Sequence, residues 1–139
     1  MLIKQALFQN TAIAEASKSL DATVLRSKAI ASNMANLMTP GYQRIEVDFE
    51  SKLKLELDRI RENGRKSDWD TEGIKEAFRR VEPVAHRSSG TMLPGGINNV
   101  DVDLEAATMA ENRILFQYDI RFIQDEKSLI DSAIRGQSS

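Results

Sequence analysis

Cysteine is absent from this chain of 139 residues, and histidine occurs once. Without cysteine the chain can form no disulfide, no thiolate metal site and no cysteine nucleophile. The single histidine, His86, has no second histidine or cysteine to join it in an ordinary transition-metal site, and it leads into a glycine- and serine-rich segment, which predicts a solvated loop position. We therefore expect no enzyme, no catalytic or metal-binding residues, no cofactor and no small-molecule substrate.

Long apolar runs and a strong charge of one sign are also missing. No segment is apolar enough to cross a bilayer, and the N-terminal MLIKQALFQN lacks the residue order of a cleaved secretory signal. The formal net charge is −2 and the pI is near 5.5, which argues against a nucleic-acid partner. If the protein leaves the cytoplasm, we expect a route without a cleaved signal.

A helical pattern of small and apolar residues runs from about Thr11 to Met38. Its members recur at spacings of three and four: Ile13, Ala16, Leu20, Val24, Ser27, Ala31, Met34 and Met38. Such a narrow seam is typical of close, coiled-coil-like helix contact. A core helix of an isolated bundle would show the same pattern.

This helix is followed by a turn, in the segment SNMANLMTPGYQR from Ser32 to Arg44. Pro40 cannot continue a helix, and Gly41 can take the positive φ that the third position of a type II turn requires. We expect the helix to close near Asn36 and the chain to reverse. Taken alone, these residues would also fit an ordinary helix end.

A second long helix is predicted from Asp101 to about Arg135. Asp101 is a plausible N-cap, and Asp103 and Glu105 place negative charge in the first turn, where the helix dipole favours it. Two neighbouring apolar stripes follow, one of Leu104, Leu115, Tyr118, Phe122 and Leu129, the other of Met109, Phe116, Ile120, Ile123, Ile130 and Ile134. An apolar arc of this width must be buried on more than one side, which favours contacts between subunits.

The two helices enclose a charged middle. Short helices are predicted over Phe49–Arg61 and Thr71–Val81, and Arg87–Asn99 reads as an irregular connection. The expected fold is mainly α, with long N- and C-terminal helices paired in a coiled-coil-like layer. We divide the chain into residues 1–44, 45–97 and 98–139, and expect the two terminal parts to form one inner helical domain.

Two motifs resemble a known family. The segment SKAIASNMANLMTPGYQR is similar to the motif near the N-terminus of flagellar rod and hook axial proteins, and matches it at Asn33, Ala35, Asn36, Thr39, Pro40, Gly41 and Tyr42. The C-terminal segment resembles a rod protein of the basal body within that family, at Asn98, Asn99, Val100, Asp101, Ala110, Glu111, Asn112, Tyr118, Ala133 and Ile134. Met34, Ala106 and Ala107 depart from the family pattern.

The resemblance implies a structural role. It implies a subunit of the proximal rod, a tubular drive shaft in the periplasm, exported by the flagellar type III apparatus without a cleaved signal. Implied partners are copies of itself, other proximal rod proteins, the adaptor beneath the rod, the MS ring and the export gate. The assembly contacts would come from Leu20, Val24, Ala31, Met34, Leu104, Leu115, Tyr118, Phe122, Ile123, Ile130 and Ile134.

Alternatives remain at this stage. The chain could be another proximal rod protein, or a soluble helical adaptor or chaperone that binds partner helices in the cytoplasm. Phe8 could be an anchor for the export gate, or it could pack on the base of the helix.

Overall fold

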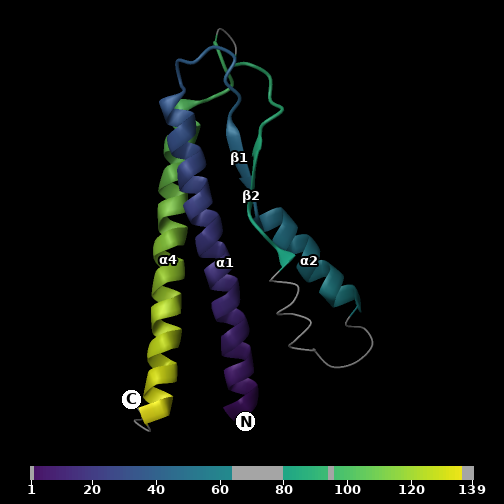
Figure 1. Ribbon diagram of the computed structural model, residues 1–139, viewed down its shortest axis with the longest axis vertical. Helices are drawn as coiled ribbons and strands as arrows, with labels where there is room; N and C mark the ends of the chain where they lie inside the picture. Colours follow the sequence, from purple (N-terminus) through teal and green to yellow (C-terminus); the bar gives the residue numbers. More distant parts are fainter. Residues whose placement is uncertain (1, 64–79, 94–95, 136–139) are drawn as a thin grey trace.

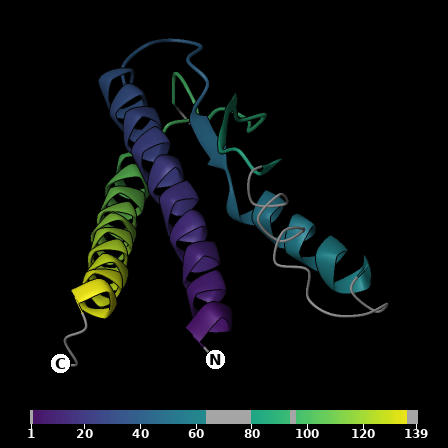
Figure 2. The same cartoon turned by 60° about the horizontal axis from the view of Figure 1, so that its bottom comes forward.

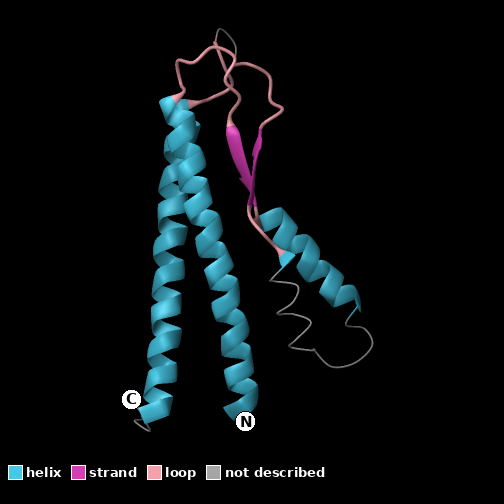
Figure 3. Ribbon diagram, viewed as in Figure 1, coloured by secondary structure: helices cyan, strands magenta, loops and turns pink. Residues whose placement is uncertain are grey.

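Two long antiparallel helices dominate the structure, a computed structural model that describes residues 2–63, 80–93 and 96–135. Helix α1 spans Leu2–Ala35 and helix α4 spans Val102–Arg135, and the two lie side by side with both chain ends at the same end of the pair (Figure 1). Figure 2 and Figure 3 show that the rest of the described chain adds a narrow ribbon of two strands and a shorter helix. The prediction of a mainly helical fold with paired terminal helices is confirmed.

The ends of these helices follow from their capping residues. Helix α1 begins at Leu2, earlier than the predicted Thr11, and ends at Ala35, next to the predicted stop. Helix α4 has Asp101 as its N-cap, because the Oδ1 atom of Asp101 accepts hydrogen bonds from the backbone N–H groups of Asp103 at 2.9 Å and Leu104 at 3.2 Å. The predicted start of α4 is therefore confirmed.

A two-stranded antiparallel ribbon corrects the prediction for the middle segment, which expected only short helices and loops. Strand β1 spans Ile45–Asp48 and strand β2 spans Val84–Arg87, with Ile45 opposite Arg87 and Asp48 opposite Val84. The ribbon lies against α1. Strands of four residues carry too few alternations of apolar and polar side chains to be recognised from the sequence.

The position predicted for His86 was wrong for the same reason. This residue lies on β2 and pairs with Glu46 across the ribbon, not in a loop. Its Nε2 atom is 3.7 Å from a carboxylate oxygen of Glu46, and its Nδ1 atom is 3.5 Å from one of Asp48. His86 therefore contributes to the ribbon surface.

A small apolar core joins the ribbon end to α1. Helix α2 spans Glu50–Asn63, close to the predicted Phe49–Arg61, and Phe49 just before it is buried with Ala22 and Val81. Leu53 packs against this cluster. The helix predicted over Thr71–Val81 falls mostly on residues outside the described ranges.

Candidate functional site

Asn33 is the centre of a buried polar cluster near the end of α1. Its side chain is fully buried, and its Nδ2 group donates to the carbonyl of Ile45 at 2.9 Å and to Glu105 Oε1 at 3.1 Å. Its Oδ1 atom accepts from the N–H of Ile45 at 2.8 Å and from the hydroxyl of Tyr42 at 3.1 Å. Both donors and both lone pairs of the amide are thus used, which lets one side chain join α1, β1 and α4.

Glu105 brings a carboxylate into the same cluster. It is fully buried, and its Oε1 atom also accepts from Arg44 Nε at 2.5 Å. Arg44 in turn contacts Glu46 through Nη1 at 2.5 Å. Burial alone would lower the pKa of the Arg44 guanidinium, but the hydrogen bond and charge attraction to Glu105, helped by Glu46, outweigh it and raise that pKa. Arg44 therefore stays charged and holds the buried carboxylate.

The turn after α1 has the predicted geometry. Gly41 has φ of 71°, as the third position of a type II turn requires, and the N–H of Tyr42 donates to the carbonyl of Thr39 at 3.3 Å. The Tyr42 hydroxyl donates to Asn33, so the Ser32 hydroxyl 3.1 Å away must be the donor in their contact. The turn thereby directs Tyr42 back onto the last turns of α1.

Asn98 closes the turn from the other side of the chain. Its Nδ2 group lies 2.7 Å from the carbonyl oxygen of Leu37, 3.1 Å from that of Asn36 and 3.2 Å from that of Thr39. Its Oδ1 atom accepts from the N–H of Val100 at 3.0 Å. A single amide thus faces three carbonyl groups of the turn that follows α1 and ties this turn to the segment before α4.

Backbone contacts complete this join. The N–H of Gly41 donates to the carbonyl of Ile97 at 2.9 Å, and the N–H of Arg44 donates to Asn99 Oδ1 at 2.7 Å. Two sequence motifs more than fifty residues apart are therefore one hydrogen-bonded unit, which we call the clasp. It comprises Asn33, Asn36, Thr39, Gly41, Tyr42, Arg44, Asn98, Asn99 and Glu105.

Comparison with known proteins gives the clasp a context. The chain is similar to the flagellar basal body rod protein FlgB of Proteus mirabilis strain HI4320, at 31% identity over 106 residues that cover 73% of this chain and 77% of the relative. The FlgB protein of Borrelia hermsii is 31% identical over 73% of this chain and 78% of its own length. That of Bacillus subtilis strain 168 is 30% identical over 81% and 83%.

The chain belongs to the FlgB family of flagellar basal body rod proteins. No general protein-family model matches it. The resemblance drawn from the two motifs is confirmed, and the chain is a structural component of the rod, not an enzyme.

Most motif residues of this FlgB family member lie in or beside the clasp. Val100 is buried and Asp101 caps α4, while Ala35 and Pro40 are exposed next to the turn. The sequence does not predict that Arg44 and Glu105 share one site, because the first turn of a helix already favours an acidic residue such as Glu105. Their partnership joins positions 61 residues apart, and no local pattern reports it.

The assembly residues predicted for this FlgB family member divide by exposure. Val24, Ala31, Leu104, Leu115 and Tyr118 are exposed in the single chain. Others are half-buried, namely Leu20, Met34, Phe122, Ile123 and Ile130. Phe8 and Ile134 lie on α1 and α4, but their side chains fall outside those that the structure describes.

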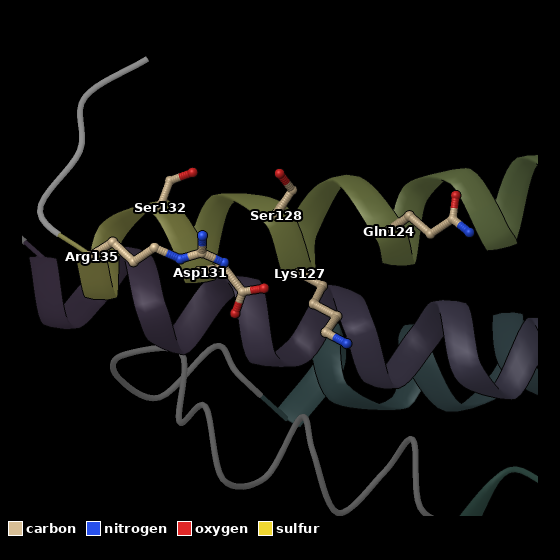
Figure 4. A pocket seen from close by; sticks show the side chains of 6 residues that line it. All are labelled: Gln124, Lys127, Ser128, Asp131, Ser132 and Arg135. Carbon is tan, nitrogen blue, oxygen red and sulfur yellow. The ribbon is translucent and has the colours of Figure 1, made fainter.

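One hollow lies on the surface of the C-terminal half of α4. This hollow of ≈ 300 Å³ is lined by Gln124, Lys127, Ser128, Asp131, Ser132 and Arg135. Figure 4 shows that these six side chains come from α4. Within the described ranges there is also no group of three residues that could hold a metal ion, and no helix long and apolar enough to span a membrane.

Proposed function

We propose that this chain is a subunit of the proximal rod in which α1 and α4 form one inner helical domain. In this proposal residues 1–44 and 98–139 make the inner domain, and residues 45–97 extend from it. The clasp fixes the end of α1 to the start of α4 and sends the chain outward through the ribbon. The chain's membership of a rod protein family and the pairing of α1 with α4 support this division.

The observation that carries the proposal is an apolar stripe along α4 that no described residue covers. Leu104 is 49% exposed, Leu115 42%, Tyr118 66% and Leu129 53%. At about 100° per residue these four side chains lie within about 60° of one another around the helix. An exposed apolar row of this length is typical of a surface that another subunit covers.

The surface of the neighbouring subunit that covers this stripe need not be the same stripe. Helix α1 has its own exposed apolar and small residues, among them Val24 and Ala31. Contact between two different patches on successive subunits is heterologous, and when the rotation does not close a ring it produces a helical tube. The chain would then assemble with copies of itself and with other proximal rod proteins through heterologous contacts of this kind.

Location and remaining partners follow as part of the proposal. In this proposal the chain lies in the periplasm, next to the adaptor beneath the rod, the MS ring and the export gate. It would reach this place through the flagellar type III apparatus without a cleaved signal.

Substitutions on α4 test the proposed contact face. Leu115→Ser with Leu129→Ser removes two members of the stripe, and we expect loss of rods in isolated basal bodies seen by electron microscopy, and loss of swimming. Leu55→Ser with Met92→Ser is the matched control, because both residues are exposed and apolar but lie outside α4. Normal rods in the stripe variant would contradict the proposal. A parent protein that stays in the cytoplasm as a folded monomer would contradict it as well.

Phe8→Ala tests the export contact separately. If Phe8 binds the export gate, the variant accumulates in the cell and little is secreted. If it packs on the helix base, secretion is normal and rod assembly fails. The secreted fraction and the yield of basal bodies, measured on the same cultures, distinguish the two roles.

A further inference from the structure

Four polar side chains form a line along α4 that starts in its first turn. Glu105, Asn112, Asp119 and Glu126 recur every seven residues, which is close to two helical turns and keeps them on one face. The first three are 0%, 3% and 6% exposed. Each of the four has a buried oxygen with no hydrogen-bond partner among the described residues: Glu105 Oε2, Asn112 Oδ1, Asp119 Oδ2 and Glu126 Oε2. We call these four residues the polar ladder.

The first two residues of the polar ladder bind α1. Glu105 accepts from Asn33, and Asn112 Nδ2 donates to the carbonyl of Thr23 and to Ser27 Oγ, both at 2.8 Å. Thr23 is itself 1% exposed, so the contact between Asn112 and Thr23 is shielded from solvent. The polar ladder therefore faces α1 and meets it in a fixed order, with a carboxylate at the first position and an amide at the second.

A line of this kind adds little to the strength of helix pairing. Buried polar groups lose water and gain in return only the hydrogen bonds they make, and here one oxygen at each position gains none. The role best attested for a buried polar residue at heptad spacing is to fix the register and the choice of partner. The order of side chains in the polar ladder shows how this would work.

Sliding α4 by one heptad in either direction mismatches the ladder. It places a carboxylate, from Glu105 or Asp119, opposite the Thr23 carbonyl that Asn112 now binds, so an acceptor meets an acceptor. When Glu105 moves there, Arg44 also loses its buried partner. Pairing two parallel α4 helices through this face would set carboxylate against carboxylate at three of the four positions.

We propose that the polar ladder sets the register of α4 against α1 and reserves this face of α4 for α1, with Asn112 as the residue that determines specificity. The apolar stripe of Leu104, Leu115, Tyr118 and Leu129 lies on a different part of the helix surface and stays available to other subunits. This inference concerns pairing within one chain and does not depend on the rod contacts proposed above.

An exchange of two ladder residues tests the proposal without changing composition. The exchange Asn112→Asp with Asp119→Asn is made in an Asn98→Ala, Asn99→Ala background, because the clasp contacts of these two residues would otherwise hold the start of α4, and it yields the order Glu, Asp, Asn, Glu. A slide of one heptad then restores the original match, because Asp at 112 reaches Asn33 and Arg44 while Asn at 119 reaches Thr23 and Ser27. We expect a second register, shifted by about 10 Å along the helix axis.

Pulsed electron paramagnetic resonance measures the register directly. The chain has no cysteine, so Lys28→Cys and Arg113→Cys supply the only two thiols for attaching spin labels. Both positions are exposed. Labelled chains are diluted in unlabelled chains of the same variant, so that only distances within a chain are recorded. The parent should give one distance and the exchanged variant two.

The matched control exchanges two exposed residues of α4, Glu111→Gln with Gln117→Glu, and should keep the single parental distance. A single parental distance in the ladder exchange, with helicity by circular dichroism unchanged, would overturn the proposal. If the ladder exchange reduces the helicity, the same distance is measured instead in the single variant Asn112→Leu. A broadened distance distribution then supports the proposal, and one narrow parental distance refutes it.

Discussion

Asn33 and Glu105 are 72 positions apart in the sequence, and a hydrogen bond of 3.1 Å joins their buried side chains. Asn33 is the donor in this bond, and the same side chain also donates to and accepts from the backbone of Ile45. The end of α1, the start of the ribbon and the first turn of α4 therefore share one amide. Exchange of its nitrogen for oxygen would affect all three elements at once.

Asn33→Asp should destabilise the protein although it hardly changes the side-chain shape. The substitution removes the donor to Glu105 and to the Ile45 carbonyl, and it places a second carboxylate beside a buried one. We expect a loss of about 3 kcal/mol or more in the free energy of unfolding, since buried acceptors without donors each cost about 1–3 kcal/mol. Urea denaturation followed by circular dichroism measures it.

Glu105→Gln provides the control for this substitution. Combined with Asn33→Asp it removes the pair of like charges and gives position 105 a donor toward position 33. The double variant should therefore lose less stability than the sum of the two single variants. If the stability loss of the double variant equals the sum of the losses of the two single variants, the two side chains do not interact in solution.

Arg44 should matter more to the clasp than its exposure suggests. Arg44→Met leaves the Glu105 carboxylate buried without its cation, and we expect a cost of about 3–5 kcal/mol. Arg44→Met combined with Glu105→Met removes both charges and should be less destabilising than Arg44→Met alone. A thermal melt of each variant compares them, and equal melting temperatures for the parent and Arg44→Met would refute the ion pair.

The same pair should resist alkali. Because the pKa of Arg44 in the folded chain is raised, its contribution to stability is complete at every pH below its ordinary value and is lost only as the pH passes above that value, in strong alkali. The difference in unfolding free energy between the parent and Arg44→Met should therefore be constant between about pH 8 and pH 10. A steady decline over this range would show that another group controls the clasp.

Local sequence chemistry was enough to predict some features of this structure. Asp101 as N-cap, Gly41 in the turn and the long helical periodicities each depend on residues within a few positions of one another. The ribbon was missed because strands of four residues are too short for an alternation of apolar and polar side chains to be recognised. The partners of Glu105 were missed because its local setting, the first turn of a helix, already accounts for an acidic residue.

The exposed stripe on α4 shows a second limit. The sequence predicted a wide apolar arc, and the structure divides it between half-buried residues such as Ile123 and exposed ones such as Tyr118. Periodicity places side chains on faces, but it does not state which neighbour covers each face. That assignment needs the packing of the two helices.

Substitutions of Gly41 should follow the strain of a positive φ. A Cβ atom added here would meet no other atom within 4 Å, so crowding contributes nothing and the backbone conformation alone sets the cost. We expect Gly41→Asn to be mildest, because asparagine tolerates this region, and Gly41→Val to be the most destabilising at about 1–3 kcal/mol. Unfolding in urea gives the order, and motility of strains carrying each variant shows whether the turn matters for rod assembly. An equal cost for both substitutions, or rods and motility at parental levels with Gly41→Val, would contradict this role of the turn.

Asn98 should show an unusual order of substitution effects. Its Nδ2 group faces the carbonyl oxygens of Leu37, Asn36 and Thr39, so Asn98→Asp would direct a carboxylate oxygen at three acceptors. Asn98→Ala removes this donor and the acceptor of the Val100 N–H without placing a charge there, at a cost of about 1–3 kcal/mol. We therefore expect Asn98→Asp to be less stable than Asn98→Ala, although aspartate is closer in shape to asparagine.

Thermal unfolding of the two variants, with Asn99→Asp as the matched control, checks this order. The oxygen of Asn99 accepts from the N–H of Arg44, a bond that aspartate keeps, and only a 3.3 Å donation to the Gly90 carbonyl is lost. Asn99→Asp should therefore remain close to the parent. If Asn98→Asp melts above Asn98→Ala, the amide of Asn98 does not bind the end of α1 as described.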